Sequence, residues 1–283
     1  MDGCRFSLLV LLIVLAAVLI GLASAHPGPE EEMEIEYNYG SNLGSNKWGN
    51  LHQHYETCLS GKMQSPIDID KNDAVLNETL GSLIRKYTSA NATLVNHIYS
   101  VGVLFEEDFG ELVIDGRIYT LKQMHWHTPS EHQINGVRYD AELHLVHQAY
   151  DDGIAVVAIL YQLGRDDPLV SALKNKLEEL ADDDKCKKEE RAEIPLGKFD
   201  SKLIKIKPRK YYRYLGSLTT PPCTEYVVWT VLARVRTISN SQVEMLRAPL
   251  DKPYKKNARP VQVLNGRKIQ AYYDQITNPL GNE

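Results

Sequence analysis

The chain has 283 residues, of which 43% are hydrophobic and 24% are charged, and its net charge is −5. Its 32 basic residues form no stripe along the sequence, which argues against a protein that binds nucleic acid. The length suits one large domain with a substantial core, and the sequence contains no internal repeat.

The first 25 residues are predicted to be a secretory signal peptide. Arg5 precedes an apolar run at residues 8–20, and the small residues at 23–25 close the segment. The run has 13 residues, fewer than the ~20 that a membrane-spanning helix needs, so a signal anchor is the weaker alternative. Cleavage before His26 leaves a chain without a membrane anchor, whose destination is the extracellular space, the vacuole or a plastid reached through the secretory route.

Secretion also bears on cysteines and glycosylation. Three cysteines remain after cleavage, Cys58, Cys186 and Cys223, so we expect one disulfide and one leftover thiol, with all three pairings open at this point. Asn77 and Asn91 each begin an Asn-x-Thr sequon, which predicts glycosylation.

Residues 26–47 form an acidic lead, rich in Gly and Asn, with no periodicity that would build a core. We expect this lead to be a mobile arm. The packed domain is expected to span residues 48–283, beginning at about Trp48.

From Trp48 onward, short runs of alternating apolar residues separated by turn signals predict strands. These runs lie at residues 99–105, 111–127, 141–150, 154–163 and 226–235. Asp115-Gly116, inside the second run, predicts a hairpin. Helices of any length are predicted only at residues 167–184 and 239–250. The predicted fold is therefore mainly β with peripheral helices, in a single domain.

Five of the nine histidines lie within residues 123–148. His125 and His127 are two residues apart on a predicted strand, so they project to the same side. A third ligand would come from the neighbouring strand, where His144 and His147 have opposite parity. Only one of the two can therefore join the pair.

Potential hydrogen-bond acceptors favour His144 over His147. Glu142 lies two residues before His144 on the same face, and Gln123 lies two residues before His125. Such acceptors orient metal-bound imidazole rings. We expect His147 to make a buried hydrogen bond on the other face.

Three imidazole ligands without a fourth protein ligand are typical of an open, catalytic zinc site. The alternative is that these histidines are surface or hydrogen-bonded core groups, as most single histidines are. The two matched acceptors favour the zinc site. A closed structural zinc site is not indicated, because no paired cysteine motif lies nearby.

Four sequence motifs together resemble the alpha-class carbonic anhydrases, and in particular their plant branch. They are "QMHWH" at 123–127, "SEH" at 130–132, "AELHLVH" at 141–147 and "SLTTPPCTE" at 217–225, and they occur in the family's order. The resemblance covers nearly the whole chain after about Trp48. It implies a large, twisted, mostly antiparallel sheet with Zn²⁺ at the bottom of a conical cleft.

The implied activity is reversible hydration of carbon dioxide to bicarbonate and a proton, through attack by a zinc-bound hydroxide. The residues that match the family's zinc ligands are His125, His127 and His144, and those that match the ligands' hydrogen-bond partners are Gln123 and Glu142. Thr219 matches the threonine that accepts a hydrogen bond from the hydroxide, and Glu131 the carboxylate that orients this threonine. Thr220 matches a substrate contact.

The resemblance further implies an apolar wall for carbon dioxide, made of Val146, Val156, Leu218, Val227 and Trp229. Cys58 and Cys223 match the cysteine pair that is bridged in secreted and plant members. Cys186 is then the odd thiol, either free or joined to a second chain, so a monomer and a disulfide-linked dimer both stay open.

Two positions depart from the family pattern. Tyr99 stands where the fast members carry their proton-shuttle histidine, and His97, two residues earlier, is the nearest substitute. A phenol with a pKa near 10 is a poor proton acceptor at neutral pH. We therefore expect proton export to limit turnover, with His97 as a weak relay. Asn50 stands where the family has an aromatic residue just beyond Trp48-Gly49.

Two other functions are compatible with the same fold. One is a storage or carbohydrate-binding protein without catalysis, which the loss of a zinc ligand would indicate; all three ligands are present here. The other is a zinc esterase, which we expect as a side activity.

Overall fold

The computed structural model describes residues 5–6, 36–40, 42–105, 109–182, 186, 191–206 and 208–274. Apart from Arg5 and Phe6, the predicted signal peptide lies outside the described residues, as do the first ten residues of the arm. Within the described ranges, no helix is both long and apolar enough to cross a membrane.

Strands account for most of the regular structure. They are β1 (Arg5–Phe6), β2 (Asp68–Ile69), β3 (Val75–Leu76), β4 (Ile84–Tyr87), β5 (Ala90–Asn96), β6 (Val101–Phe105), β7 (Gly110–Ile114), β8 (Arg117–His127), β9 (Gln133–Ile134), β10 (Val137–Arg138), β11 (Ala141–Gln148), β12 (Ile154–Leu163), β13 (Ala192–Phe199), β14 (Lys210–Ser217), β15 (Glu225–Leu232), β16 (Arg236–Ile238) and β17 (Gln270–Tyr273).

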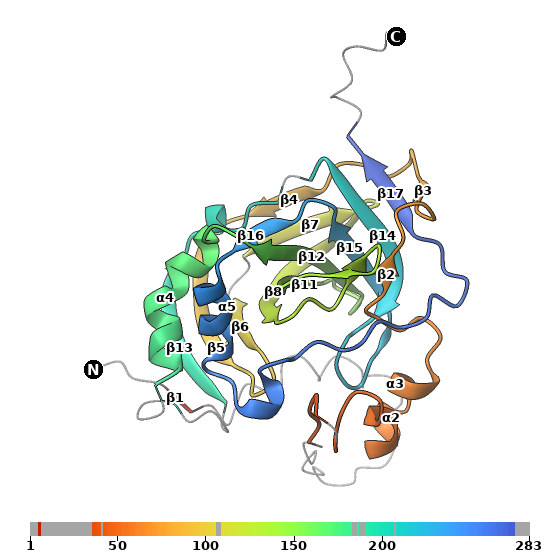
Figure 1. Ribbon diagram of the computed structural model, residues 1–283. Helices are drawn as coiled ribbons and strands as arrows, with labels where there is room; N and C mark the ends of the chain where they lie inside the picture. The colour runs from red at the N-terminus through yellow and green to blue at the C-terminus, as the bar shows by residue number, and fades with distance from the viewer. Residues whose placement is uncertain are drawn as a thin grey trace, which may run out of the picture.

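One 14-stranded sheet forms the body of the molecule, with the order β1-β13-β5-β6-β8-β11-β12-β15-β14-β17-β3 along its main path. β4, β7 and β16 pair beside this path, while β2, β9 and β10 form a small second sheet. In the large sheet, pairing is antiparallel except between β12 and β15, β12 and β16, and β17 and β3. The predicted large, twisted and mostly antiparallel sheet is confirmed (Figure 1).

The helices lie at the edge of the sheet. They are α2 (Trp48–Leu51), α3 (Thr57–Ser60), α4 (Pro168–Leu180) and α5 (Asn240–Arg247), together with 3-10 turns at Gln53–Tyr55, Ser201–Leu203 and Lys252–Tyr254. Figure 1 shows α4 and α5 beside β13 and β5, and α2 and α3 at the opposite end of the molecule. Both long helices lie within the ranges that the sequence predicts.

Local sequence explains where these two helices start. The Asp167 side chain accepts hydrogen bonds from the backbone N–H groups of Leu169 and Val170 at the start of α4, with Pro168 in the first turn. α5 opens with a capping box between Ser239 and Gln242.

The hairpin between β7 and β8 turns at Asp115 and Gly116, whose φ angles of 50° and 78° are both positive. A two-residue turn of this kind fits the twist of the flanking strands. The predicted hairpin is confirmed, and it sets the register of β8, the strand that carries His125 and His127.

β11 separates two apolar clusters. Leu143 and Leu145, which have the parity of His147, belong to the larger cluster, whereas Val146, which has the parity of His144, packs against the smaller one. The two faces of this strand therefore meet different surroundings.

The described part of the N-terminal arm is packed rather than free. The rings of Tyr37 and Tyr39 lie 5.3 and 5.5 Å from the ring of Trp48, and the indole N–H of Trp48 donates to the backbone oxygens of Asn38 and Leu43. Packing thus begins before Trp48, because isolated aromatic residues anchor a segment that has no apolar periodicity.

Candidate metal centre

Strand register brings three histidines together. His144 on β11 lies directly opposite His125 on β8, and His127 follows on the same face of β8. The ring nitrogens of these three residues lie within 4.8 Å of one another, with 3.1 Å between Nε2 of His125 and Nε2 of His127. The described residues therefore contain the three-histidine group that the alternating strands predict.

Each of the three rings is held through its other nitrogen. Nδ1 of His125 donates to Oε1 of Gln123 at 2.7 Å, and Nε2 of His144 donates to Oε1 of Glu142 at 2.7 Å. The third acceptor, at 2.6 Å from Nδ1 of His127, is the backbone oxygen of Asn257. The nitrogens left over are those that converge, which is the arrangement expected of oriented metal ligands.

The pKa values of two of these histidines favour the neutral ring. Burial lowers the pKa of His125 well below its ordinary value, and the neighbouring His127 and His144 lower it further. Burial also lowers the pKa of His127. Neutral imidazole is the form that binds metal ions, so His125 and His127 are already in their binding form.

His147 lies on the opposite face, as its parity predicts. Its Nε2 accepts from the hydroxyl of Tyr87 at 2.6 Å, and its Nδ1 donates to the backbone oxygen of Ala155 at 3.2 Å. Burial lowers its pKa to about 4. This histidine is a satisfied core residue.

Glu142 is the centre of a buried polar network. Its Oε1 also accepts from Nδ1 of His132 at 2.6 Å, and its Oε2 accepts from the backbone N–H groups of Glu131 and His132. The Tyr214 hydroxyl donates in turn to Nε2 of His132 at 2.7 Å. Burial acts to raise the pKa of Glu142, but His132 and His144 outweigh it and hold this pKa well below its ordinary value. The carboxylate is therefore ionised and fixes the His144 ring.

Glu131 presents one oxygen to the histidines. Its Oε1 accepts from the backbone N–H of Arg259 at 2.8 Å. Its Oε2 lies 3.4 Å from Nε2 of His127 and 4.0 Å from Nδ1 of His144, and it is buried without a hydrogen-bond partner among the described residues. A buried carboxylate oxygen without a partner is costly, and it marks a place for a donor.

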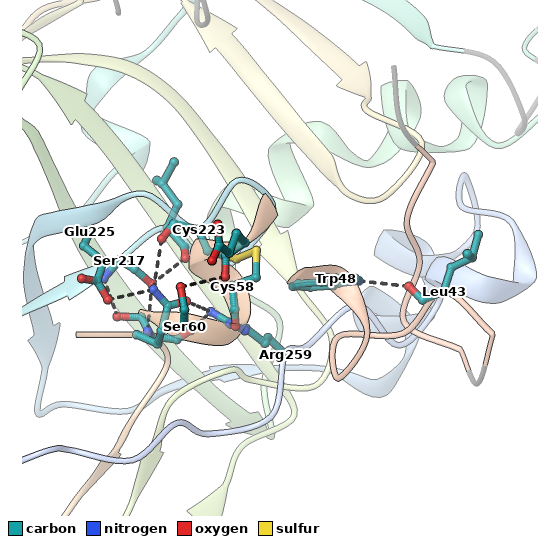
Figure 2. Close-up of a disulfide and its surroundings, with 12 residues drawn as sticks. Leu43, Trp48, Cys58, Ser60, Ser217, Cys223, Glu225 and Arg259 are labelled. Atoms are coloured by element: carbon teal, nitrogen blue, oxygen red, sulfur yellow. Dashed lines mark hydrogen bonds between the residues drawn. A yellow bond between two sulfur atoms is a disulfide. The ribbon is translucent and has the colours of Figure 1, made fainter. Parts of the chain in front are cut away.

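The turn that carries Thr219 is tethered by the disulfide between Cys58 and Cys223 (Figure 2). Thr219 itself is buried. The backbone N–H of Cys223 donates to the oxygen of Thr220, and Gln64 donates to the oxygen of Cys223. The expected pairing of Cys58 with Cys223 is confirmed.

Arg259 links this turn to the histidine site. Its backbone N–H holds Glu131, while its guanidinium donates to the backbone oxygens of Cys58 and Ser65 and to the side chain of Gln64, each at 2.8 Å. The side chain lies beside the disulfide in Figure 2. Arg259 thus links the segments that carry Cys58, Gln64 and Glu131.

Five apolar residues beside the histidines belong to the smaller core cluster. Trp229 is the largest, and its ring centroid lies 4.9 Å from that of His144. Its companions are Val156 and Val227, which are buried, and Val146 and Leu218, which are partly buried. All five residues of the expected apolar wall therefore lie together.

His97 is held in a neutral state. Its Nδ1 accepts from Nη2 of Arg191 at 3.0 Å, and burial, followed by the charge of Arg191, lowers its pKa to about 3. A group with so low a pKa takes up almost no protons at neutral pH. These contacts argue against His97 as a proton relay.

Tyr99 lies in a group of tyrosines. Its ring is 5.3 Å from that of Tyr37 and 6.2 Å from that of His97. The Tyr37 hydroxyl is hydrogen-bonded to the side chains of Thr220 and Tyr99. Tyr37, which the sequence places in the arm, thus touches two expected site positions.

Asn50 and Tyr39 bear on the missing aromatic residue beyond Trp48-Gly49. Asn50 is exposed on α2. The hydroxyl of Tyr39 is buried without a partner among the described residues, and its pKa is raised by burial and then by the charge of Glu131. The departure at Asn50 therefore stands, while Tyr39, from before Trp48, is an aromatic residue on which the charge of Glu131 acts.

Cys186 and the two sequon asparagines lie in different surroundings. Cys186 is 1% exposed and is not a free thiol, since the described cysteines are all disulfide-bonded. The expectation of a leftover thiol at Cys186 concerns the chain after cleavage before His26, and it stays a prediction, as does the choice between a monomer and a disulfide-linked dimer. Asn91 is exposed on β5, whereas Asn77 is partly buried and donates to Gln270.

Comparisons with known proteins identify a family. The model of the family described as eukaryotic-type carbonic anhydrase matches residues 43–273. Alpha carbonic anhydrase 7 of Arabidopsis thaliana is 41% identical over 270 residues, which cover 95% of this chain and 96% of that protein.

Two solved structures are also similar. The crystal structure of dioscorin complexed with ascorbate has a TM-score of 0.81 and 39% identity, covering 86% of this chain and all of that one. An alpha carbonic anhydrase from Thermovibrio ammonificans, in complex with the inhibitor sulfanilamide, has a TM-score of 0.74 and 33% identity, with coverages of 84% and 100%.

Proposed function

The chain belongs to the eukaryotic-type carbonic anhydrase family, and on that premise we propose that it catalyses the reversible hydration of carbon dioxide with a zinc ion held by His125, His127 and His144. The observation that carries the proposal is the convergence of three ring nitrogens whose partner nitrogens are all fixed by acceptors. Three histidine donors without a fourth protein ligand fit an open, catalytic zinc site better than a closed structural one.

Zinc supplies the Lewis acidity that makes water nucleophilic at neutral pH, for which carbonic anhydrases are the standard example. The chain's own contribution is to hold three rings rigidly. Gln123, the Asn257 backbone oxygen and Glu142 each accept the outer ring proton. The ionised Glu142 also makes the His144 ring a stronger donor to the metal.

Glu131 and Thr219 would orient the reacting water. The oxygen Oε2 of Glu131 is buried, points at the histidines and lacks a partner, so it can accept the hydroxyl proton of Thr219. The Thr219 oxygen would then accept a hydrogen bond from the water and direct a lone pair towards the carbon of the substrate. Preorganised groups of this kind need little rearrangement during the reaction.

The apolar cluster would receive carbon dioxide. Val146, Val156, Leu218, Val227 and Trp229 offer no hydrogen-bonding group that would hold water there in preference to an apolar substrate, apart from the Trp229 N–H, which is bonded to Ser217. Thr220 lies beside Thr219 and contacts Tyr37, so we assign it a substrate contact at the opening.

The test is zinc content and carbon dioxide hydration of the wild type and of His144→Ala, by elemental analysis and stopped flow. We expect stoichiometric zinc and hydration in the wild type. In His144→Ala the rate should fall by more than the ~10–100-fold typical of losing one outer partner of a metal ligand. His54→Ala, at an exposed histidine, is the control and should retain both the zinc content and the hydration rate of the wild type.

A folded wild type that takes up no zinc, or takes up zinc without hydrating carbon dioxide, would overturn the proposal and favour the non-catalytic binding protein. Circular dichroism of each variant separates loss of the site from loss of the fold. Ester cleavage by the same preparations tests the proposed side activity, which should fall together with hydration in His144→Ala.

We further propose that the chain follows the secretory route. The disulfide between Cys58 and Cys223 supports an oxidising compartment, and Asn91 is exposed enough to accept a glycan. Expression in a eukaryotic secretory host, followed by N-terminal sequencing and a glycosidase mobility shift, tests both. Retention of residues 1–25 would contradict the cleaved signal peptide.

A further inference from the structure

A second pocket lies apart from the histidine site. It has a volume of about 400 Å³ and is lined by Arg85, Lys205, Ile206, Pro208, Leu232, Arg234 and Arg236. These residues come from β4, the segment before β14, the end of β15, the link that follows it and β16. Figure 1 shows β4 and β16 towards the top of the view, with α2 and α3 at the bottom. None of them belongs to the histidine site or its apolar wall.

The polar part of the lining is entirely cationic. Arg85, Lys205, Arg234 and Arg236 contribute four positive charges to this pocket of a chain whose net charge is −5. Among the described residues, the only ion pair that these four make is between Arg236 and Asp167, at 2.6 Å. Arg85, Lys205 and Arg234 thus form no ion pair within the described ranges, although the charge of Lys205 also acts on Asp167, and with four cations facing one carboxylate the local potential is positive.

Arg85 and Arg236 are fixed in place by their neighbours. Nε of Arg85 donates to the backbone oxygen of Ile206 at 2.9 Å. The guanidinium of Arg236 is held by Asp167 on one side and lies 5.4 Å from the ring centroid of Tyr161. Two of the cations are thus positioned before any ligand arrives, which lowers the entropy cost of binding.

Arg236 also carries an unused donor. Its Nη1 is buried and has no hydrogen-bond partner among the described residues. A buried charged donor without a partner is unfavourable, and an anion in the pocket would satisfy it. This atom is an observation that points to a ligand independently of the count of charges.

The rest of the lining is apolar. Ile206 and Leu232 are buried, and Pro208 is partly buried, so they form a floor, while Lys205 and Arg234 are exposed at the rim. The volume lies within the range of pockets that bind small molecules. A bare inorganic ion would leave this floor uncovered.

We propose that this pocket binds a small organic anion, whose acidic group meets Arg234, Arg236 and Lys205 and whose apolar body covers Ile206, Pro208 and Leu232. The planar guanidinium groups suit a carboxylate, sulfonate or phosphate group, each of which can accept two parallel hydrogen bonds. The site is separate from carbon dioxide hydration.

The test is calorimetric titration of the protein purified from the secretory host with 2-naphthoate, which combines a carboxylate with a flat apolar body. We expect saturable binding that weakens as salt is added. Lys205→Gln/Arg234→Gln, which changes two exposed rim residues, should raise the dissociation constant at least tenfold. The matched control Lys62→Gln/Lys268→Gln removes the same charge at exposed positions elsewhere. Its dissociation constant should stay within twofold of the wild-type value.

Two further ligands separate the parts of the proposal. Neutral 2-naphthylmethanol should bind much more weakly than 2-naphthoate, and so should inorganic phosphate. Equal binding of either one, unchanged affinity in Lys205→Gln/Arg234→Gln, or no binding of 2-naphthoate at millimolar concentration would overturn the proposal. Carbon dioxide hydration should be unchanged in this variant, so the test does not depend on the proposed function.

Discussion

His144 and His147 lie three residues apart on β11 but face two different regions of the molecule. On the His144 face, ring nitrogens, carboxylates and a tyrosine hydroxyl are linked in a buried polar network. On the His147 face, the histidine meets one tyrosine, one backbone oxygen and a large apolar cluster. The neighbours of a histidine, rather than its residue type, decide its role.

The two faces are also held together by different means. The apolar face is stabilised by side-chain packing within the larger cluster, to which α4 and α5 also contribute residues. The polar face depends on groups from distant segments, such as Arg259 and the turn bridged by Cys58 and Cys223. Perturbations far from the histidines should therefore affect the polar face more than the apolar face.

The largest expected effect comes from removing the tether. Cys58→Ser/Cys223→Ser should lower the free energy of unfolding by about 2–5 kcal/mol, because the bridge joins positions 165 residues apart and restricts the unfolded chain. Equilibrium denaturation measures the loss. Hydrogen exchange should show reduced protection at residues 217–224 but not in β5 and β6. An unchanged denaturation midpoint would contradict this prediction. An equal loss of exchange protection at residues 217–224 and in β5 and β6 would contradict the difference between the two faces.

Next in size is the pH dependence that His147 produces on the apolar face. Its folded pKa of about 4 lies below the unfolded value near 6.5, so the unfolded chain takes up the proton first. The zinc-free protein should therefore lose about 3 kcal/mol of stability from this group as the pH falls from about 6.5 to 4. In denaturation experiments, His147→Gln should lose less stability than the wild type over this pH range, whereas the control His54→Gln should lose as much as the wild type. If the free energy of unfolding of His147→Gln and of the wild type changed with pH in parallel, His147 would not be the source of the pH dependence.

A smaller effect is expected for Glu142→Gln on the polar face. The substitution removes the charge that orients His144 while keeping an oxygen acceptor, so zinc affinity should fall by roughly 10–100-fold. Competition with a chelator measures the affinity. Glu178→Gln, at an exposed glutamate, is the control. Equal affinities for the wild type and Glu142→Gln would show that the metal site does not need this network.

The smallest effect concerns His97. His97→Ala should change turnover far less than the ~10²–10⁴-fold that a working general acid or base contributes, because the ring is neutral and bonded to Arg191. Tyr99→His should instead raise turnover in dilute buffer, and imidazole should raise that of the wild type. Stopped flow at several imidazole concentrations checks all three statements. A large loss in His97→Ala that imidazole restores would contradict them.

Strand alternation predicts the centre of the site well. The period of two places His125, His127 and His144 on one face and His147 on the other, and the register of β8 and β11 brings the first three together. The signal is strong because the pairing of the two strands is regular from Glu142 to Val146, and the register shift lies beyond it, between Val146 and His147. The fold class and both long helices follow from similar local patterns.

Other parts of the site have no local signal. The acceptor for His127 is the backbone oxygen of Asn257, which any residue could provide, and it lies 130 positions away. Arg259 acts partly through its backbone N–H. His132 is visible in the sequence, but its role depends on Tyr214, 82 residues later. Contacts of this kind are set by the tertiary structure alone.

Some strands were also missed for physical reasons. β13 contains Pro195 and Gly197, and its pairing with β5 shifts register between them, so apolar alternation breaks down. β14 is buried along most of both faces and reads as a run of tyrosines and polar residues. Neither pattern resembles a strand with one exposed face.

The position of Arg259 in the chain has a consequence for biosynthesis. Glu131 and the carbonyl of Cys58 both bond to this residue, and His127 bonds to its near neighbour Asn257. A nascent chain that has emerged only as far as α5 carries every histidine of the site but cannot yet lock them. The centre is therefore completed late in translation, after most of the sheet has already left the ribosome.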